Sequence, residues 1–245
     1  MRLLGIDTGG SSLKAAPVDV TSGVLASDVV SFPTPAPATP GAIAGVVKQI
    51  AAAFPDVSGP VGFAFPSVVT AGIARTAANV DKAWIGTDGA RLVREATGRP
   101  AAFLNDADAA ALAEMRVGAG RGQDGTVIML TFGTGIGSAI FHDGHLLPNT
   151  EFGHMEIRGM EAEHRASARV RTAEQLGWPE WSERVNEVLE RMHALFWPDL
   201  FILGGGVVEN WASFGPLLES PARVVPAELG NTAGIVGAAL AAHEL

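Results

Sequence analysis

The chain has 245 residues, of which 47% are hydrophobic, and a formal net charge of −9. This length allows one or two domains with a sizeable core, and the acidic balance argues against a nucleic-acid partner, because phosphate backbones are held by basic surfaces. The absence of cysteine excludes disulfides and thiolate metal sites. The sequence shows neither an apolar run as long as a membrane span nor a signal-peptide pattern, so we expect a cytoplasmic protein without a membrane partner.

The chain opens with a polar glycine turn between two buried strands. Residues 3–6 predict an apolar strand, residues 7–12 (DTGGSS) the turn, and residues 13–18 the returning strand, which continues through a hairpin into residues 24–30. The elements expected next are a helix, a strand, a hairpin, a helix, a strand and a helix, at residues 39–54, 61–65, 68–76, 88–97, 101–104 and 106–118.

The same pattern returns in the second half of the chain. Residues 127–131 and 138–141 predict apolar strands on either side of the turn GTGIG, and Asp143 and Gly144 predict a two-residue hairpin after them. Two copies about half a chain apart indicate duplicated domains rather than a solenoid, whose repeats are shorter. The chain is completed by a long amphipathic helix, a buried strand and two further helices, at residues 179–196, 200–203, 209–218 and 231–243.

This alternation of strands and helices predicts a mixed α/β fold. We expect an N-terminal domain of residues 1–107 and a larger C-terminal domain of residues 108–230. The final segment, residues 231–245, is rich in glycine and alanine, which suits close packing of a helix back onto the N-terminal domain.

Both glycine turns are candidate phosphate sites, because backbone N–H groups converge in such turns and suit an anion. The first adds hydroxyls, the cation of Lys14 and the carboxylate of Asp7, which could hold Mg²⁺ directly or through water. The alternative for each turn is a tight connection that binds nothing. Neither turn has the spacing of a P-loop or of a dinucleotide-binding loop.

Three polar residues, Asn105, Asp106 and Asp108, stand where a buried strand becomes a helix. Helix capping alone would explain one of them. A carboxylate at this place could accept a hydrogen bond from a substrate hydroxyl and take its proton during phosphoryl transfer. We expect the helix N-terminus to stabilise the ionised form and so to keep this carboxylate a weak base.

A third polar group consists of Glu151 and His154, with Glu156 beyond them. A carboxylate and an imidazole could bind neighbouring sugar hydroxyls, and the amide of Asn79 could do the same. The alternatives are a local surface hydrogen bond for the pair and a plain turn residue at Asn79.

In this order, the two glycine turns, the Asn-Asp strand end and the Glu-x-x-His loop resemble the ROK family of sugar kinases, which belongs to the actin-like, ribonuclease-H-like ATPase superfamily. The strings RTAANVDKAWIGTD, LNDADAAALAE, LTFGTGIGSAIFHDG, PNTEFGH and RASARVR are similar to those of bacterial polyphosphate glucokinases, a compact branch of the family. The resemblance covers essentially the whole chain. It implies two ribonuclease-H-like domains around a cleft, and a homodimer.

The resemblance further implies Mg²⁺-dependent phosphoryl transfer from inorganic polyphosphate, with ATP as a second donor, to the 6-hydroxyl of glucose. Asp106 would be the catalytic base. The glucose contacts would be Asn79, Asn105, Asp106, Glu151 and His154. The donor-binding residues would be Asp7 (also the Mg²⁺ contact, through water), Thr8, Gly9, Gly10, Ser11, Ser12, Lys14, Thr131, Gly133, Thr134, Gly135 and, near any adenosine, Gly204, Gly205 and Gly206.

One departure from the family pattern concerns zinc. In many ROK kinases a cysteine-rich zinc motif follows the residues that correspond to Gly153 and His154. Because this chain lacks cysteine, we expect no zinc site, and only a sugar contact is carried over to His154. A further sugar-binding glutamate beyond that motif has no clear counterpart, and Glu156 is the candidate to replace it.

Two alternatives stay open. An ATP-dependent glucokinase or glucomannokinase would present the same motifs, but Arg165, Arg169 and Arg171 form a basic strip that favours polyphosphate, because an extended polyanion needs positive surface beyond the reacting phosphate. The strip could equally be a solvated helix face. A non-catalytic, sugar-sensing ROK-type regulator is disfavoured, because the first strand begins at residue 2 or 3 and leaves no room for a preceding helix-turn-helix.

Overall fold

The computed structural model describes residues 1–78 and 80–245, and these divide into two compact units. Unit 1 comprises Met1–Ala113 and Thr232–Leu245, and unit 2 comprises Glu114–Asn231. The first boundary therefore falls at Ala113, inside a helix, where residue 107 was expected. No described helix is both long enough and apolar enough to cross a membrane.

Unit 1 is built on a mixed sheet with the strand order β3-β2-β1-β5-β8, and a sixth strand, β4, also pairs with β2. The strands are β1 (Arg2–Thr8), β2 (Ser12–Asp19), β3 (Val24–Leu25), β4 (Val30–Pro33), β5 (Val61–Phe65) and β8 (Ala101–Asn105). Strand β1 is antiparallel to β2 but parallel to β5, which is in turn parallel to β8. The carboxyl ends of β1 and β8 therefore lie at the same edge of the sheet.

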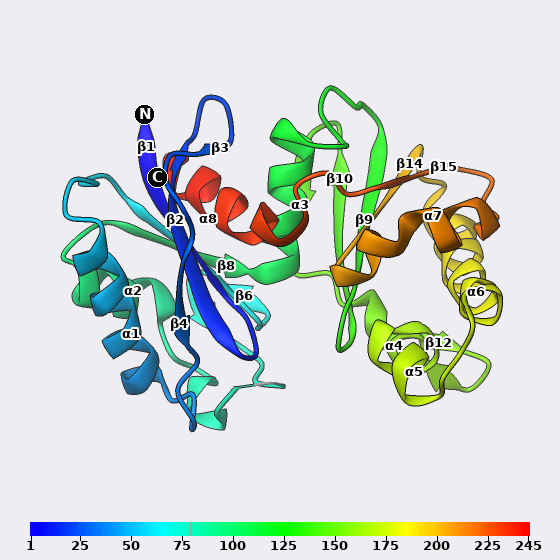
Figure 1. Ribbon diagram of the computed structural model, residues 1–245, viewed down its shortest axis with the longest axis horizontal. Coiled ribbons are helices and arrows are strands. Elements are labelled where there is room, and N and C mark those ends of the chain that lie inside the picture. Colours follow the sequence, from blue (N-terminus) through cyan, green and yellow to red (C-terminus); the bar gives the residue numbers. More distant parts are fainter. Residues whose placement is uncertain (79) are drawn as a thin grey trace. The chain divides into compact units, whose positions relative to one another are not determined.

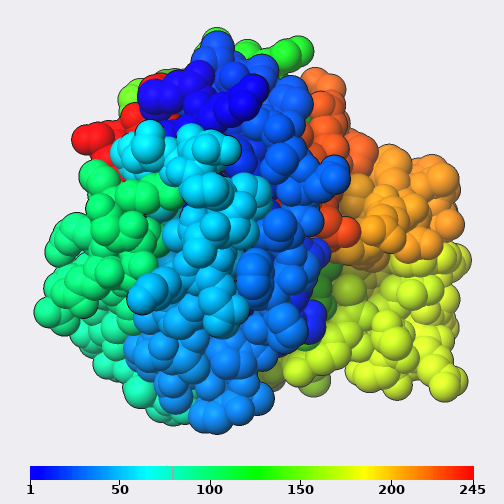
Figure 2. Space-filling model, turned by 60° about the vertical axis from the view of Figure 1, so that its left-hand side comes forward, coloured from blue at the N-terminus to red at the C-terminus, as the bar shows by residue number. Residues whose placement is uncertain are grey.

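Helices cover both faces of this sheet (Figure 1). On one face lie α1 (Pro40–Ala53) and α2 (Gly89–Thr97), which pack their apolar side chains against those of the sheet, such as Ile6 and Phe63. On the other face lies α8 (Ala233–His243), together with the first turns of α3 (Asp106–Val117). Helix α1, in medium blue, lies at the surface of unit 1 in Figure 2.

Helix α8 packs against the sheet backbone to backbone. The sheet presents Gly5 and Gly62 to it, and a Cβ added to Gly62 would overlap the carbonyl group of Ala238. Only glycine permits so close an approach of a helix to a strand. The predicted packing of the final helix onto the N-terminal strands rests on these contacts of α8 with β1 and β5.

A loop between β5 and α2 contains two short strands, β6 (Val69–Thr70) and β7 (Ile73–Ala74), and a turn of 3-10 helix, η1 (Lys82–Trp84). Trp84 is fully buried, and its indole N–H donates to the carbonyl of Ala38. Asn79, one of the predicted glucose contacts, belongs to this loop but lies outside the described residues.

Unit 2 repeats the strand order of unit 1 in a five-stranded sheet, β11-β10-β9-β14-β15. Its strands are β9 (Thr126–Phe132), β10 (Ile136–His142), β11 (His145–Leu147), β14 (Leu200–Gly204) and β15 (Arg223–Pro226). Strand β9 is antiparallel to β10 and parallel to β14, as β1 is to β2 and β5. The predicted duplication is thus confirmed, although β15 was not predicted.

The long helix of unit 2, α6 (Trp178–Phe196), buries one face against the sheet. Trp181, Val185 and Leu189 on that face meet Leu130 and Phe132 of β9 in one apolar cluster. The smaller elements are η2 (Phe152–His154), β12 (Glu156–Ile157), β13 (Met160–Glu161), α4 (Ala162–Ala166), α5 (Ala168–Ala173), η3 (Gly206–Asn210), α7 (Trp211–Phe214), η4 (Gly215–Leu217) and η5 (Gly230–Thr232).

The single helix expected at residues 209–218 is wrong, because this stretch folds as the three short turns η3, α7 and η4. Pro216 has no N–H to donate, so it cannot continue the hydrogen-bond ladder of a helix.

A buried carboxylate joins the two ends of unit 2. Glu114, on α3, is fully buried and accepts hydrogen bonds from the backbone N–H groups of Ala119, Glu228 and Leu229, at 2.9, 3.1 and 2.8 Å. Such bonds to an ionised acceptor are roughly twice as strong as those between neutral groups. Glu114 therefore fixes the place where the chain enters unit 2 beside the place where it leaves.

Candidate active site

The first glycine turn, between β1 and β2, is closed by backbone hydrogen bonds. The N–H of Gly9 donates to the carbonyl of Ser12 at 2.9 Å. Thr34 holds the outside of the turn, because its hydroxyl donates to the carbonyl of Gly9 and its N–H to that of Ser11. Gly10 at the tip is exposed, and an added Cβ there would meet nothing within 4 Å. The turn is thus an anchored, open concavity.

Two carboxyl groups stand at this edge of the unit 1 sheet. Burial raises the pKa of the Asp7 carboxyl to about 6, with a further increase from the nearby Asp106 and a decrease from Lys14. Burial also raises the pKa of Asp106 above its ordinary value, against the effect of the backbone N–H of Ala107, which donates to it at 2.9 Å. Asp106 is therefore near enough to Asp7 for its charge to raise the pKa of that carboxyl.

The raised pKa of Asp106 contradicts one expectation. The N-terminal position on α3 was expected to keep this carboxylate a weak base, but desolvation outweighs the hydrogen bond from the helix backbone. A carboxylate with a raised pKa is a better proton acceptor once it is ionised. Asp106 is therefore better suited to proton transfer than its place at a helix N-terminus alone indicated.

The buried hydroxyl of Thr8 adds a further oxygen atom to this edge. It has no hydrogen-bond partner in the described part of the chain, although the residue is only 3% exposed. A buried hydroxyl is normally satisfied by protein or by water. Thr8 follows Asp7 on β1, so its side chain points to the opposite face of the sheet, the face that also carries Leu4 and Ile6.

Asn105 is the helix cap among the three polar residues at the end of β8. Its side-chain oxygen accepts from the N–H of Asp108 at 3.0 Å, as an N-cap does, and its amide donates to the carbonyl of Ser67 at 3.1 Å. One acceptor site of the oxygen and one amide hydrogen of Asn105 are thus used within the protein, which leaves the other acceptor site and the other hydrogen for the predicted glucose contact. Capping by Asn105 also leaves Asp106 without that task.

The second glycine turn, between β9 and β10, differs in what surrounds it. The N–H of Gly133 donates to the carbonyl of Gly135 at 3.0 Å, and the carbonyl of Gly133 accepts from the N–H of Arg169, also at 3.0 Å. A carboxylate oxygen of Glu163 accepts from the N–H of Ile136 at 3.4 Å and lies against Gly135. Thr134 at the tip is exposed.

The triglycine stretch lies beside this second turn. Gly204 ends β14 in register with Thr131, and Gly205 adopts a φ of +87° with its backbone packed on Phe132. The positive φ and the close approach together require glycine at position 205. Gly206 is exposed and begins η3. The predicted donor-binding role of these residues stays a prediction.

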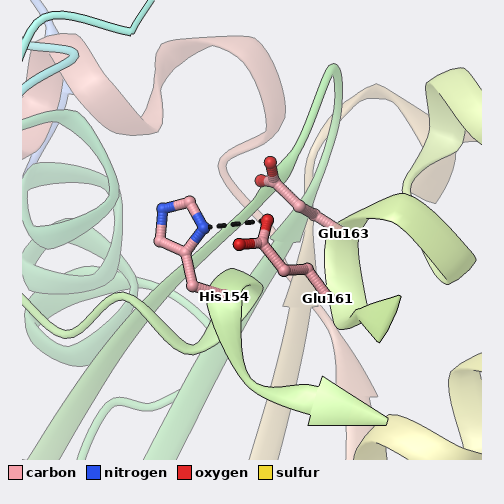
Figure 3. Close-up of side chains that lie close together, drawn as sticks. All are labelled: His154, Glu161 and Glu163. Atoms are coloured by element: carbon pink, nitrogen blue, oxygen red, sulfur yellow. Dashed lines mark hydrogen bonds and ion pairs between the residues drawn. The ribbon is translucent and has the colours of Figure 1, made fainter. Parts of the chain in front are cut away.

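His154 ends the turn η2 and is surrounded by glutamates (Figure 3). Its Nδ1 lies 3.2 Å from a carboxylate oxygen of Glu161, and its Nε2 lies 3.9 Å from one of Glu151. The hydrogen bond with Glu161 raises the pKa of His154 above its ordinary value of 6.5, although partial burial opposes the shift.

Two of these glutamates were missed in the sequence. Figure 3 shows Glu161 pointing toward His154, with the carboxylate of Glu163 beside it, and these three residues offer ligand atoms within 4.8 Å of one another. Glu156, the proposed stand-in for a sugar-binding glutamate, is exposed on β12, in register with Glu161. The signal that could have found Glu163 is its place in the first turn of the short helix α4, which follows the Glu-x-x-His loop. The expectation of no zinc stays a prediction.

The three arginines do not form one free basic strip. Arg165 donates to Glu187 through Nε at 3.0 Å and also through Nη2. The guanidinium of Arg171 stacks on the ring of Trp178, 3.5 Å from its centroid. Arg169 is exposed.

A family model described as "ROK family" matches residues 3–168 of this chain, which is more than half of its length. The chain belongs to the ROK family. Its mixed α/β fold with a repeated strand order is the actin-like ATPase fold of ROK sugar kinases.

Among ROK proteins, the chain is similar over most of its length to enzymes that carry related names. It is 50% identical over 238 residues to a polyphosphate glucokinase of Mycobacterium tuberculosis (strain CDC 1551 / Oshkosh), an alignment that covers 97% of this chain and 89% of the relative.

Two solved structures extend the comparison to the fold. The inorganic polyphosphate/ATP-glucomannokinase of Arthrobacter sp. strain KM superposes with a TM-score of 0.94 at 44% identity, and covers 99% of this chain and 98% of its own. A ROK family glucokinase of Streptomyces griseus, solved in complex with glucose and AMPPNP, gives a TM-score of 0.82 at 27% identity over both complete chains.

Proposed function

We propose that this protein is a polyphosphate glucokinase, which transfers a phosphoryl group from inorganic polyphosphate, and also from ATP, to the 6-hydroxyl of glucose. The observation that carries the proposal is the 50% identity to the M. tuberculosis polyphosphate glucokinase over 97% of the chain. The similarity to the Arthrobacter enzyme supports both donors. We further expect a cytoplasmic homodimer, as the family resemblance implies.

Asp106 acts as the catalytic base in this proposal. Its carboxylate accepts a hydrogen bond from the 6-hydroxyl, orients that oxygen toward the donor phosphorus, and takes the proton as the new P–O bond forms and the bond to the leaving phosphate breaks. Burial favours this role, because it raises the proton affinity of the carboxylate. Asn105, which caps α3, holds the helix start from which Asp106 projects.

The edge that carries Asp7 fits a magnesium ion. A carboxylate oxygen is a donor that Mg²⁺ accepts, and Asp7 offers one at the end of β1. A cation here would also relieve the repulsion between Asp7 and Asp106. When bound, Mg²⁺ would neutralise charge on the donor phosphates. Asp7 would hold it, directly or through water, opposite Lys14.

The remaining predicted residues bind the two substrates. The turns at residues 8–12 and 133–135 present backbone N–H groups and hydroxyls to the donor phosphates. Glu151 and His154 bind glucose hydroxyls, and Asn79 is proposed to do the same. We add Glu163, because it lies beside His154 and is fixed by the second glycine turn. It would thereby connect the sugar contacts with the donor contacts.

The proposal is tested by measuring glucose 6-phosphate with the purified protein, Mg²⁺ and glucose, using polyphosphate or ATP as the donor. We expect turnover with both. Turnover with ATP alone would establish the alternative, an ATP-dependent glucokinase or glucomannokinase, and mannose as a second acceptor would separate these two. Glucose binding without turnover with either donor would leave the sugar-sensing regulator.

A further inference from the structure

Arg169 is held directly against the second glycine turn. Its backbone N–H donates to the carbonyl of Gly133 at 3.0 Å. The start of α5 is also held by its N-cap residue, because the hydroxyl of the fully buried Ser167 accepts from the N–H of Val170. The Cα of Arg169 therefore keeps a set position beside the turn, while its side chain is exposed.

The space beside this turn is open. Gly133 is exposed, and a Cβ added to it would meet no atom within 4 Å. No hydrogen bond or ion pair engages the guanidinium of Arg169 within residues 1–78 and 80–245. In contrast, Arg165 is hydrogen-bonded to Glu187, and Arg171 stacks on Trp178. Its charge is thus available at the rim of a turn that is proposed to bind phosphate.

The other two arginines are committed to the fold. Glu187 neutralises Arg165 and also pairs with Arg158 at 2.9 Å, so two cations share one carboxylate. Arg171 is spread over the face of Trp178, where its planar guanidinium contributes to packing. Removing Arg165 would disturb the packing of α4 on α6, and removing Arg171 that of α5 on α6, so neither change would report on a ligand.

We propose that Arg169 binds donor phosphates beyond the one transferred, and so sets the preference for polyphosphate over ATP. The inference rests on the proposed function. Polyphosphate continues as a chain of charged groups past the glycine turn, whereas the phosphates of ATP end at a nucleoside. An arginine offers two parallel N–H donors that match phosphate oxygens. A single guanidinium at the rim therefore adds more contacts to the longer donor.

The test compares Arg169→Ala and Arg169→Lys with Arg191→Ala, an exposed arginine on α6 for which no hydrogen bond or ion pair is found in the described residues. With saturating glucose, Arg169→Ala should raise the Michaelis constant for polyphosphate about tenfold, the size of one lost hydrogen bond to a charged group. The rise for ATP should be only about two- to threefold. Arg169→Lys should lie between, and Arg191→Ala should match the wild type.

A chain-length series sharpens the test. Wild-type affinity should increase from tripolyphosphate to longer polyphosphates, and Arg169→Ala should flatten this increase. An equal loss for ATP and polyphosphate, or no loss for either, would overturn the role of Arg169.

Binding measured by calorimetry separates this inference from the proposed function, because it needs no turnover. If polyphosphate binds to the wild type without being used, and Arg169→Ala weakens that binding, the kinase proposal fails while the role of Arg169 stands. If polyphosphate is a substrate but binds both proteins equally, the kinase stands and Arg169 has no such role. Absence of binding to the wild type would overturn both.

Discussion

The two units share one strand order, yet their glycine turns carry different chemistry. In unit 1 the penultimate residue of β1 is Asp7, which lies opposite Lys14 and Ala64. In unit 2 the matching residue of β9 is Thr131, which lies opposite Gly137 and Gly204. The same scaffold thus presents a half-buried carboxylate in one unit and a hydroxyl in the other.

The charge around the turns differs in the same sense. A second acidic group, Asp106, stands beside the first turn, and together they suit a cation and a proton acceptor. The second turn has the exposed cation of Arg169 at its rim, together with the carboxylate of Glu163, which accepts from the N–H of Ile136. The duplicated strand order therefore fixes the position of each glycine turn. The side chains at two or three positions determine the charge beside that turn.

The units also differ in how a helix meets the sheet. In unit 1, α8 rests on Gly5 and Gly62. At the matching register of unit 2 stand Met129 and Ile202, so its sheet meets its neighbours through long side chains. Backbone contact of the first kind leaves no room for an added atom, whereas side chains can adjust their rotamers.

The largest expected effect concerns the reacting proton. Asp106→Asn should lower kcat by roughly 1,000-fold, because the amide cannot accept a proton, which is the usual scale for loss of a general base. The Michaelis constant for glucose should change little. Steady-state kinetics with saturating donor measures both values.

The comparison variant in unit 2 is Thr131→Val, at the position that corresponds to Asp7. It should raise the Michaelis constant for the donor about threefold, while kcat stays within about twofold of the wild type. An Asp106→Asn enzyme that binds glucose and turns over at a near wild-type rate would refute the assignment of proton transfer to unit 1.

The next effect concerns stability in unit 1. Gly62→Ala should lower the free energy of unfolding by about 3 kcal/mol, because the new methyl group forces α8 away from β5. Urea denaturation followed by circular dichroism measures this change.

Gly45→Ala is the control for this substitution. Gly45 lies inside α1, and its added Cβ would meet nothing within 4 Å. It should raise stability by about 0.5 kcal/mol, because alanine favours the helix. Two glycine-to-alanine changes in one unit should therefore have opposite signs. A Gly62→Ala protein as stable as the wild type would refute the backbone-to-backbone contact.

The smallest effect concerns pH in unit 2. His154 should titrate above 6.5, because Glu161 stabilises the imidazolium. A raised pKa in the folded state means that this stabilisation is fully present below pH 6.5 and is lost as the pH rises through the folded value. The effect is small because the imidazole is more than half exposed.

Glu161→Gln should lower the titration midpoint of His154 in NMR spectra, with His154→Asn used to assign its signal. The stability difference between the wild type and Glu161→Gln should be larger at about pH 5.5 than at about pH 8.5. An unchanged midpoint would show that the pair seen in Figure 3 does not form in solution.

Local patterns sufficed for much of the fold. Strand β5 has the predicted bounds, and α6 begins within one residue of its predicted start, because apolar periodicity reports directly on burial. Strand β15 was invisible, since Arg223–Pro226 is short and only partly buried. The continuous helix expected over residues 209–218 does not form, because Pro216 lacks the N–H that the helix would need.

Predicting the candidate site from the sequence alone met a different limit. Residue types at the turns and at Asp106 pointed to phosphate and proton chemistry. The placement of the first turn and Asp106 at one edge of the unit 1 sheet follows from the strand order. Partners distant in the sequence could not be predicted: Glu187 engages Arg165, and burial raises the pKa of Asp106. The hydrogen bond from the amide of Asn105 to the carbonyl of Ser67 could not be predicted either, because the two residues are far apart in the sequence.

The hydrogen bonds of Glu114 have a consequence for how unit 2 is joined to the rest of the chain. Unit 2 is a single uninterrupted stretch, Glu114–Asn231, and Glu114 hydrogen-bonds to Glu228 and Leu229 near the opposite end of that stretch. A segment whose two ends lie close together can be inserted into another domain at a single site in its chain. Residues 114–231 should therefore be separable as an autonomous polypeptide with its ends already closed.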